Sequence, residues 1–244
     1  MENTGDCLVS NRPTIIVPDI HNRTDRVSYL LNKYPDNPFI FLGDWWDNFY
    51  DVPEDAKRVA LLLNQVAVRP NTVLLWGNHD LHYFLPLPGI VCSGYNLDKQ
   101  DAINSHLEEE VWRKFNLAYG DEYLFSHAGF HSTYRPEAIP SLFEEIESAE
   151  CWIFKAGEAT KLSDELSVLP RLIRAGRDRG GQHRIGGCTW LDWDSFSDIP
   201  SCPQIVGHTP SSKVRYKGKS ICLDTHLNHF GILDHNKLTV KEIP

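Results

Sequence analysis

The sequence has little of what marks a membrane-bound, secreted or DNA-binding protein. Its longest apolar runs fall well short of the roughly 20 residues that cross a bilayer, so we expect no association with membranes. Residues 1–11 are polar and include acidic side chains, unlike a signal peptide. The net charge of −9 at pH 7 argues against duplex nucleic acid as a partner, because proteins that bind it usually carry a basic face.

The six cysteines are scattered and form no C-x-x-C pair. In a chain of 244 residues we interpret them as reduced, buried thiols, which predicts a cytoplasmic protein. The sequence also lacks internal repeats, low-complexity tracts and linkers, so we predict a single domain over residues 1–244. Residues 130–200 are less regular, and we interpret them as a variable insertion that faces the substrate.

Apolar, strand-like runs alternate with helix-like segments in the first third of the chain. We predict strands at 14–17, 38–42 and 72–76, and helices at 24–33 and from Pro53 to a stop before Pro70. This alternation predicts a parallel sheet with right-handed crossovers. For the rest of the chain we predict a helix at 101–115, helical segments at 136–170, a loop at 176–187, strands at 122–125, 204–206 and 220–223, and a closing hairpin at 230–243.

Five short motifs each follow one of the apolar runs. They are Pro18-Asp19-Ile20-His21, Gly43-Asp44-Trp45-Trp46-Asp47, Gly77-Asn78-His79-Asp80, Ser126-His127-Ala128-Gly129 and Gly207-His208-Thr209-Pro210. Ligands of parallel sheets gather beyond the carboxyl ends of the strands, so we expect these motifs to converge in space. Carboxylates, an amide oxygen and imidazoles together suit a pair of divalent ions working on a phosphate.

The spacing within the motifs predicts how the ligands would be divided between two ions. Asp19 and His21 can reach one ion, while Asp44 can bridge both ions with its two oxygens. The remaining ligands of the pair are predicted to be Asn78, His127 and His208. About three protein ligands per ion leave positions open for water and phosphate, which is typical of a catalytic site.

A proton donor is also predicted beside these ligands. His79 adjoins Asn78 and is placed to protonate a leaving alkoxide as general acid. We expect Asp47 to orient its imidazole, and Asp80 to point elsewhere. The other histidines, His82 among them, are interpreted as surface or structural residues, except that the role of His226 stays open.

These motifs resemble the signatures of the calcineurin-like metallophosphoesterase superfamily, which read G-D-x-H-G, G-D-x-x-D-R-G, G-N-H-[ED], H-[AG]-G and G-H-T. The sequence is most similar to the branch of phosphoprotein phosphatases, phage serine/threonine phosphatases and bacterial diadenosine tetraphosphatases. The resemblance spans residues 19–224. It implies an α/β (α+β) fold of four layers, in which a central β-sandwich is flanked by helices and carries a dimetal site at the strand ends.

The resemblance also implies which residues bind each ion and which supply the proton. Asp19, His21 and Asp44 would bind the first ion, and Asp44 would bind the second ion together with Asn78, His127 and His208. His79 and Asp47 would form the acid pair. The ions would be manganese, with iron and zinc, nickel or cobalt as alternatives.

The sequence departs from the family pattern at positions that bear on the substrate. Pro18 and Asn22 replace glycines, and Asn48 replaces an arginine that clamps phosphate in protein phosphatases. His226 replaces a glycine, which could place an extra imidazole at the edge of the site. A clamp could come from the arginines at 171–184, of which we favour Arg184. Trp46, like Trp45, could stack on a nucleobase or an aromatic leaving group.

We therefore predict a dimetal phosphoesterase in which a metal-bridging hydroxide attacks the phosphorus. Its phosphorylated substrate would be a phosphomonoester, such as phosphoserine or phosphothreonine in a protein, or a small molecule. An alternative is a nucleotide hydrolase acting on dinucleoside polyphosphates, or a phosphodiesterase. A third hypothesis, from another class, is a non-catalytic metal-bound scaffold. The fold alone does not decide among them.

Overall fold

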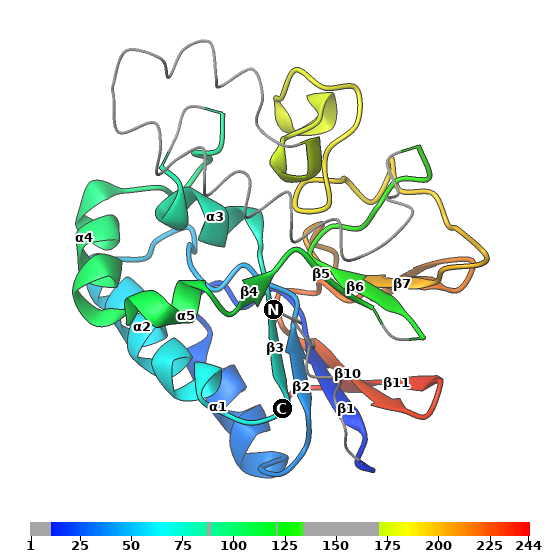
Figure 1. The fold of residues 1–244 in the computed structure, drawn as a ribbon, viewed down its shortest axis with the longest axis horizontal. Coiled ribbons are helices and arrows are strands. Elements are labelled where there is room, and N and C mark those ends of the chain that lie inside the picture. The colour runs from blue at the N-terminus through cyan, green and yellow to red at the C-terminus, as the bar shows by residue number, and fades with distance from the viewer. Residues whose placement is uncertain (1–10, 87–88, 121, 134–170) are drawn as a thin grey trace, which may run out of the picture.

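A computed structural model describes residues 11–86, 89–120, 122–133 and 171–244 (Figure 1). The predicted helical segments at 136–170 lie outside the described residues. Two β-sheets pack against each other, and helices cover the free face of the first sheet (Figure 1). The predicted α/β fold with a central β-sandwich is therefore confirmed.

The first sheet contains the strands predicted at the start of the chain. Its strands are β1 (Thr14–Val17), β2 (Phe39–Phe41), β3 (Thr72–Leu75), β4 (Phe115–Asn116), β10 (His229–Asp234) and β11 (Lys237–Glu242), in the order β11-β10-β1-β2-β3-β4. Strands β1 to β4 run parallel, which confirms the predicted parallel sheet. The closing hairpin is also confirmed, because β10 pairs antiparallel with both β1 and β11.

The second sheet is mixed. Its strands are β5 (Ala118–Gly120), β6 (Leu124–Ser126), β7 (Gln204–Val206), β8 (Arg215–Lys217) and β9 (Ser220–Cys222), in the order β5-β6-β7-β9-β8. Strands β6, β7 and β9 run parallel, and β5 and β8 close the edges in antiparallel pairing. Edge strands β5 and β8 were not predicted, because their short sequences, Ala-Tyr-Gly and Arg-Tyr-Lys, lack the apolar run that marks β6, β7 and β9.

The described residues contain five α-helices, which are α1 (Thr24–Lys33), α2 (Pro53–Ala67), α3 (Asn78–Phe84), α4 (Leu97–His106) and α5 (Glu109–Trp112). Two of them, α1 and α2, lie where the sequence predicts them, and α3 was not predicted. Pro53 opens α2, and the Asp55 side chain accepts a hydrogen bond from the Val52 N–H at 2.9 Å, which caps that helix end.

The single helix predicted at 101–115 is wrong. The Asn96 side chain accepts hydrogen bonds from the N–H groups of Asp98 and Lys99, so α4 already begins at Leu97. It ends at His106, the short α5 follows, and Phe115 pairs with Leu74 in the first sheet. The predicted loop at 176–187 contains a 3-10 turn, η3 (Arg177–Arg179), and a second one, η2 (Arg171–Ile173), precedes it.

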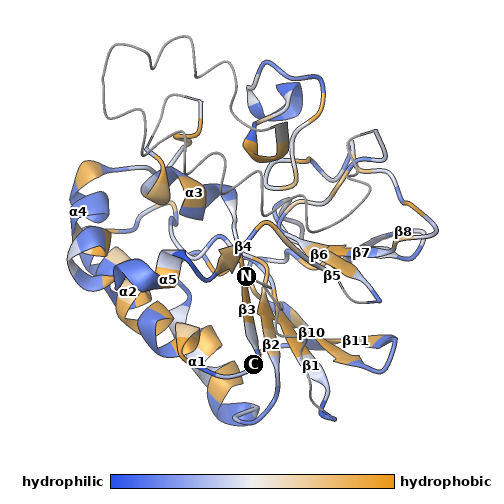
Figure 2. Ribbon diagram, viewed as in Figure 1, coloured by the Kyte–Doolittle hydropathy of each residue, from blue (hydrophilic) through white to orange (hydrophobic). Residues whose placement is uncertain are grey.

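Apolar side chains fill the spaces between these layers. In Figure 2 the strands are largely orange, whereas the helices alternate between orange and blue residues. One core lies between the first sheet and the helices, where Phe41 packs with Val59 and Leu63. A second core joins the two sheets through residues such as Leu42 and Ile205. A third cluster covers the outer face of the second sheet, where it contains Ala128, Leu191, Trp193, Phe196, Val206 and Cys222.

Two further findings concern the described part of the chain only. None of its helices is both long enough and apolar enough to cross a membrane. No disulfide joins its four cysteines, of which Cys188 and Cys222 are buried and Cys92 and Cys202 are partly exposed.

Candidate metal centre

The predicted motifs meet at one edge of the sandwich. Asp19 and His21 follow β1, Asp44 and Asp47 follow β2, and Asn78 follows β3, where it begins α3. From the second sheet, His127 follows β6 and His208 follows β7. Because β1 to β3 run parallel, as do β6 and β7, their carboxyl ends present all these side chains together.

Several of these residues adopt a left-handed backbone that L-amino acids rarely take. The φ angles are +44° for His21, +52° for Asp44, +67° for Asp47 and +68° for His208. Asn22, in place of a family glycine, has a φ of +64°, a conformation that asparagine tolerates better than most residues. Such strain clusters at functional sites, since the surrounding fold must impose it.

One group of candidate ligands consists of Asp19, His21 and Asp44, whose ligand atoms all lie within 4.8 Å of one another. His21 Nδ1 lies 2.6 Å from the Asp47 carbonyl oxygen and 3.0 Å from that of Trp46. This nitrogen therefore donates its proton to the backbone, which leaves Nε2 to face Asp44 Oδ2 at 3.7 Å. The tautomer suits an imidazole that binds a cation through Nε2.

The second group consists of Asp44, His127 and His208, so Asp44 belongs to both. His127 Nδ1 donates to the Leu42 carbonyl oxygen at 2.8 Å. Its Nε2 lies 3.1 Å from His208 Nδ1, 3.1 Å from Asn78 Oδ1 and 3.3 Å from Asp44 Oδ2. Asn78 thus adds an amide oxygen to the same cluster.

Neighbouring charges and burial both shift the pKa values of the side chains in the two groups, and for Asp44 and His127 they act in opposite directions. Burial and the charges of Asp224 and Asp44 raise the pKa of Asp19 well above its usual value. Burial alone would raise the pKa of Asp44 as well, but the charges of His127 and His79 hold it well below its usual value. Burial lowers the pKa of His127, yet Asp44 and Asp19 outweigh it and raise that pKa to about 9.

These side chains fit a pair of cations. Two ligands on one ion with bonds of ~2.1 Å lie roughly 3 to 3.5 Å apart, close to the spacings around His127 Nε2. The carboxylates of Asp19, Asp44 and Asp224 are all buried, and a positive charge among them would offset the cost of that burial. This set of oxygens and imidazole nitrogens matches hard or borderline divalent ions.

His79 and Asp47 meet beside the two groups. His79 Nδ1 lies 2.8 Å from Asp47 Oδ2, and the His79 backbone N–H donates to Asp44 Oδ1 at 2.9 Å. Burial lowers the pKa of His79, but the Asp44 charge and the hydrogen bond with Asp47 outweigh it and hold that pKa well above its usual value. With 18% of its side chain exposed, His79 can reach a substrate.

Asp47 has more partners than the sequence led us to expect. Its Oδ1 accepts hydrogen bonds from Tyr83 Oη at 2.7 Å and from Lys99 Nζ at 2.6 Å. Its Oδ2 lies 2.7 Å from His82 Nε2, in an ion-pair contact that is poorly aligned for a hydrogen bond. Despite burial, the hydrogen bond with His79 and the close contact with His82 hold the pKa of Asp47 well below its usual value.

His82 and Lys99 were not among the site residues predicted from the sequence. His82 lies three residues after His79, one helical turn along, and this spacing was the available signal. Lys99 comes from α4 and carried no signal, because only the tertiary fold brings it 52 residues back to Asp47.

Asp80 points away from His79, as expected. Its carboxylate accepts hydrogen bonds from the backbone N–H groups of Asp44, Trp45 and Gly77 at 2.8 to 2.9 Å. Burial and the charge of Asp44 raise the pKa of Asp80 to about 7. The residue fixes the Asp44 loop against the start of α3, and a Cβ at Gly77 would collide with the Asp44 side chain there.

The placement of the tryptophan pair does not support the expected stacking on a substrate. Trp45 and Trp46 are both 0% exposed, so neither ring presents a surface to a ligand. Trp46 packs against Tyr83 and Trp112 in the core, and Trp45 packs against Phe41. The motif therefore uses its two indoles to anchor the loop that carries Asp44 and Asp47.

The other predicted substrate contacts lie on the surface. Asn48, Arg184 and His226 are exposed, and their roles stay predictions. Arg179, which the sequence did not single out, donates from Nη2 to Thr209 Oγ1 at 3.3 Å, beside His208. Burial, followed by the charges of His127 and Arg179, holds the pKa of His208 well below its usual value.

The comparison with family models identifies the class of protein. Residues 12–171 match the model described as calcineurin-like phosphoesterase, so the chain belongs to this family and is a phosphoester hydrolase. The family is dimetal-dependent, and the chain has candidate ligand groups for two ions, so both residues and family agree on the type of cofactor. No curated protein matches the chain.

Three solved structures are similar to the chain at low sequence identity, and the first of them, with a TM-score of 0.54, shares its fold. A protein serine/threonine phosphatase from Saccharomyces cerevisiae with similarity to human phosphatase PP5 is 14% identical, with a TM-score of 0.54, over 96% of this chain and 80% of that one. A proposed diadenosine tetraphosphatase is 17% identical, with a TM-score of 0.42, over 96% and 95% of the two chains. The protein TT1561 of Thermus thermophilus is 12% identical, with a TM-score of 0.39, over 96% and 99%.

Proposed function

We propose that the protein is a dimetal phosphomonoesterase whose ions are held by six side chains. Asp19, His21, Asp44, Asn78, His127 and His208 would bind them. The observation that carries this proposal is that the two ligand groups share one residue, Asp44. A shared carboxylate is what a pair of closely spaced ions needs, and three protein ligands on one ion and four on the other leave positions open for a substrate.

When bound, the two ions would supply Lewis-acid chemistry, since they acidify water and neutralise charge on the phosphate. Manganese is our proposal for the metal, because the ligand set is rich in oxygen and contains no thiolate. The protein's own residues supply the proton. His79 would donate it from Nε2 to the leaving oxygen, while Asp47 accepts the hydrogen bond from Nδ1 and favours the charged imidazolium.

Arg179 is our proposal for the group that holds the substrate phosphate. Its guanidinium approaches Thr209, next to His208, and its side chain is 29% exposed. The Asp192 carboxylate accepts a hydrogen bond from Arg179 Nε at 2.8 Å. The terminal nitrogens of the guanidinium, on the side away from Nε, would then donate to two phosphate oxygens. Arg184, the residue favoured by the sequence, is the alternative.

A second candidate function is hydrolysis of a dinucleoside polyphosphate. The exposed Asn48, in place of an arginine clamp, is the observation that favours it, because an internal anhydride needs no clamp shaped for a terminal phosphate. The buried Trp45 and Trp46 no longer add support to this candidate.

Turnover of four phosphate compounds by metal-stripped protein refilled with Mn2+ tests the proposal. Hydrolysis of a phosphothreonine peptide or of p-nitrophenyl phosphate, with little cleavage of diadenosine tetraphosphate, is the expected result. Faster turnover of diadenosine tetraphosphate would instead support the second candidate function, hydrolysis of dinucleoside polyphosphates. Cleavage of bis-p-nitrophenyl phosphate alone would point to a phosphodiesterase, and no turnover at all with two ions bound would support a scaffold.

A further inference from the structure

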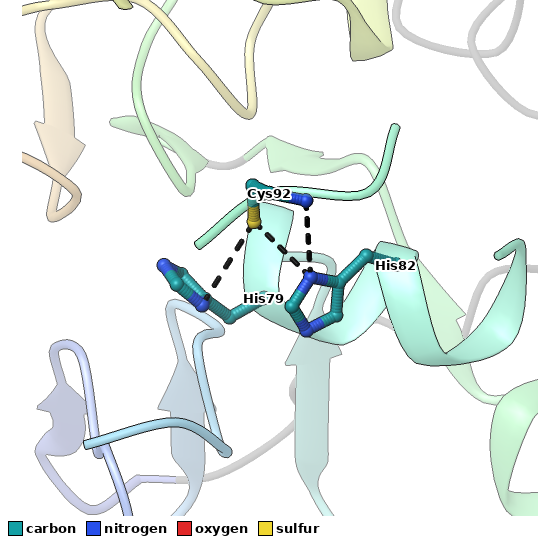
Figure 3. A group of neighbouring side chains, drawn as sticks. All are labelled: His79, His82 and Cys92. Atoms are coloured by element: carbon teal, nitrogen blue, oxygen red, sulfur yellow. Dashed lines mark hydrogen bonds between the residues drawn. The ribbon is translucent and has the colours of Figure 1, made fainter. Parts of the chain in front are cut away.

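A third group of metal-ligating side chains lies next to the acid pair. His79 and His82 project from α3, and Cys92 approaches them from the loop that follows the helix (Figure 3). Cys92 Sγ lies 3.1 Å from His82 Nδ1 and 3.9 Å from His79 Nδ1. All three ligand atoms lie within 4.8 Å of one another. The proposed dinuclear centre uses none of these three side chains as a ligand.

The spacing of these atoms fits a tetrahedral ion. Zinc bonds of about 2.3 Å to sulfur and about 2.05 Å to nitrogen place the two ligand atoms roughly 3.6 Å apart. The two observed distances from Cys92 Sγ lie on either side of this value. Small side-chain rotations would therefore complete the site.

The tautomer of His82 also suits a ligand. The Cys92 backbone N–H points at His82 Nδ1 from 3.4 Å, so this nitrogen accepts and carries a lone pair. The proton is then on Nε2, which faces Asp47 Oδ2 at 2.7 Å. Histidine ligands of zinc commonly have a carboxylate next to the ring nitrogen that does not bind the metal, as Asp47 is next to His82 Nε2.

The chemistry of the group differs from that of the dinuclear centre. One thiolate and two imidazoles favour zinc over manganese, whereas the carboxylates and the amide of the neighbouring centre suit manganese. His82 is 0% exposed, but His79 and Cys92 are partly exposed, so an ion can enter from solvent.

We propose that His79, His82 and Cys92 form a third metal site, selective for zinc, that inhibits the enzyme. The site stands on its own geometry, while the inhibition rests on the proposed role of His79. An ion on His79 Nδ1 replaces the proton of that nitrogen and its hydrogen bond to Asp47, and Cys92 gives up its thiol proton; both protons pass to solvent. An imidazole bonded to a metal at Nδ1 cannot become the imidazolium, so His79 keeps only a weakly acidic Nε2–H with which to protonate a leaving group.

Binding is tested by absorbance with Co2+ as the probe. Protein carrying two equivalents of Mn2+ is titrated with Co2+, and the thiolate-to-cobalt charge-transfer band is followed. We expect the band in the wild type and in the control Cys202→Ser, which removes the other partly exposed thiol of the described residues. Cys92→Ser should abolish the band, and His82→Gln, which keeps the thiol, should weaken Co2+ binding by about tenfold or more.

A band that persists in Cys92→Ser, or Co2+ binding that His82→Gln leaves unchanged, would overturn the site. Thermal unfolding of each variant shows that it is folded. Because the band does not depend on catalysis, it decides the site even if no phosphoester is hydrolysed, in which case the proposed function fails by itself.

Inhibition is measured as the hydrolysis rate that remains at each Zn2+ concentration, divided by the rate of the same protein without zinc. We expect Cys92→Ser to need at least about tenfold more Zn2+ than the wild type or Cys202→Ser for the same loss of rate. Inhibition by displacement of Mn2+ from the dinuclear centre would be the same in all three proteins. Equal zinc sensitivity of wild type and Cys92→Ser would therefore overturn the inhibitory role.

Discussion

His79 Nδ1 and Asp47 Oδ2 lie 2.8 Å apart, although Asp47 lies in the loop after β2 and His79 lies in the first turn of α3. The contact joins the second motif to the third and lies beside Asp44, which accepts a hydrogen bond from the His79 backbone. A proton donor is thereby held next to the residue that both candidate ligand groups share. The predictions below test the roles that this arrangement implies.

Replacing His79 by glutamine should slow hydrolysis in proportion to how poor the leaving group is. For an alkyl phosphate we expect kcat to fall by roughly 10²- to 10⁴-fold, because the departing alkoxide needs a proton. For p-nitrophenyl phosphate the loss should be much smaller, since nitrophenolate leaves unprotonated. His106→Gln, on α4, is the matched control. An equal loss on both substrates would contradict the acid role.

The two arginine candidates can be separated by steady-state kinetics. Arg179→Met should raise KM for a phosphomonoester by about 10-fold or more, the cost of losing a charge-assisted hydrogen bond to phosphate. Arg184→Met should change KM little. The opposite pattern would assign the phosphate contact to Arg184, and no change in either variant would exclude both.

Lys99 should contribute to stability through its contacts with buried carboxylates. Lys99 Nζ lies 2.6 Å from Asp47 Oδ1 and 3.0 Å from Asp51 Oδ2, and all three side chains are at most 7% exposed. Lys99→Met leaves those charges uncompensated, so we expect a loss of about 3–5 kcal/mol in the free energy of unfolding. Lys57→Met, which removes an exposed pair with Glu54, should cost less than about 1 kcal/mol.

Urea denaturation of the two lysine variants measures these losses. If Lys99→Met unfolds at the same urea concentration as Lys57→Met, the buried ion pair contributes nothing and this account of Asp47 is wrong.

Metal uptake by the metal-free protein should release protons at neutral pH. The pKa of His127 is raised to about 9, so below that pH the residue is protonated and must lose a proton before it can bind an ion. The raised pKa of Asp19 acts in the same direction. Affinity for Mn2+ should therefore rise with pH and level off above about 9.

Calorimetric titrations of Mn2+ at pH 7.5, in two buffers of different ionisation enthalpy, count the released protons. We expect at least about one proton per chain at this pH and fewer as pH approaches 9. Uptake without proton release at pH 7.5 would show that His127 is neutral in the metal-free protein.

Much of this arrangement could be predicted from local patterns. A short apolar run predicts the strand before Asp19, and apolar residues at helical spacing predict the helix after it. Both patterns extend over only a few residues. The closing hairpin and the convergence of motifs at strand ends also follow from local pattern and sheet topology.

Other features depend on contacts between distant parts of the chain. Lys99 reaches Asp47 only because α4 packs beside α2, and Arg179 reaches Thr209 from 30 residues away. The burial of Trp45 and Trp46 likewise depends on partners such as Trp112, so adjacency in sequence gave the wrong impression of an exposed aromatic pair.

The most direct test of the central claim is the electron paramagnetic resonance spectrum of metal-free protein titrated with Mn2+. If Asp44 joins two ion sites, two Mn2+ should bind per chain and the second should convert the spectrum of isolated ions to that of a spin-coupled pair. Binding of a single ion, or of two ions whose spectra stay independent, would contradict the account.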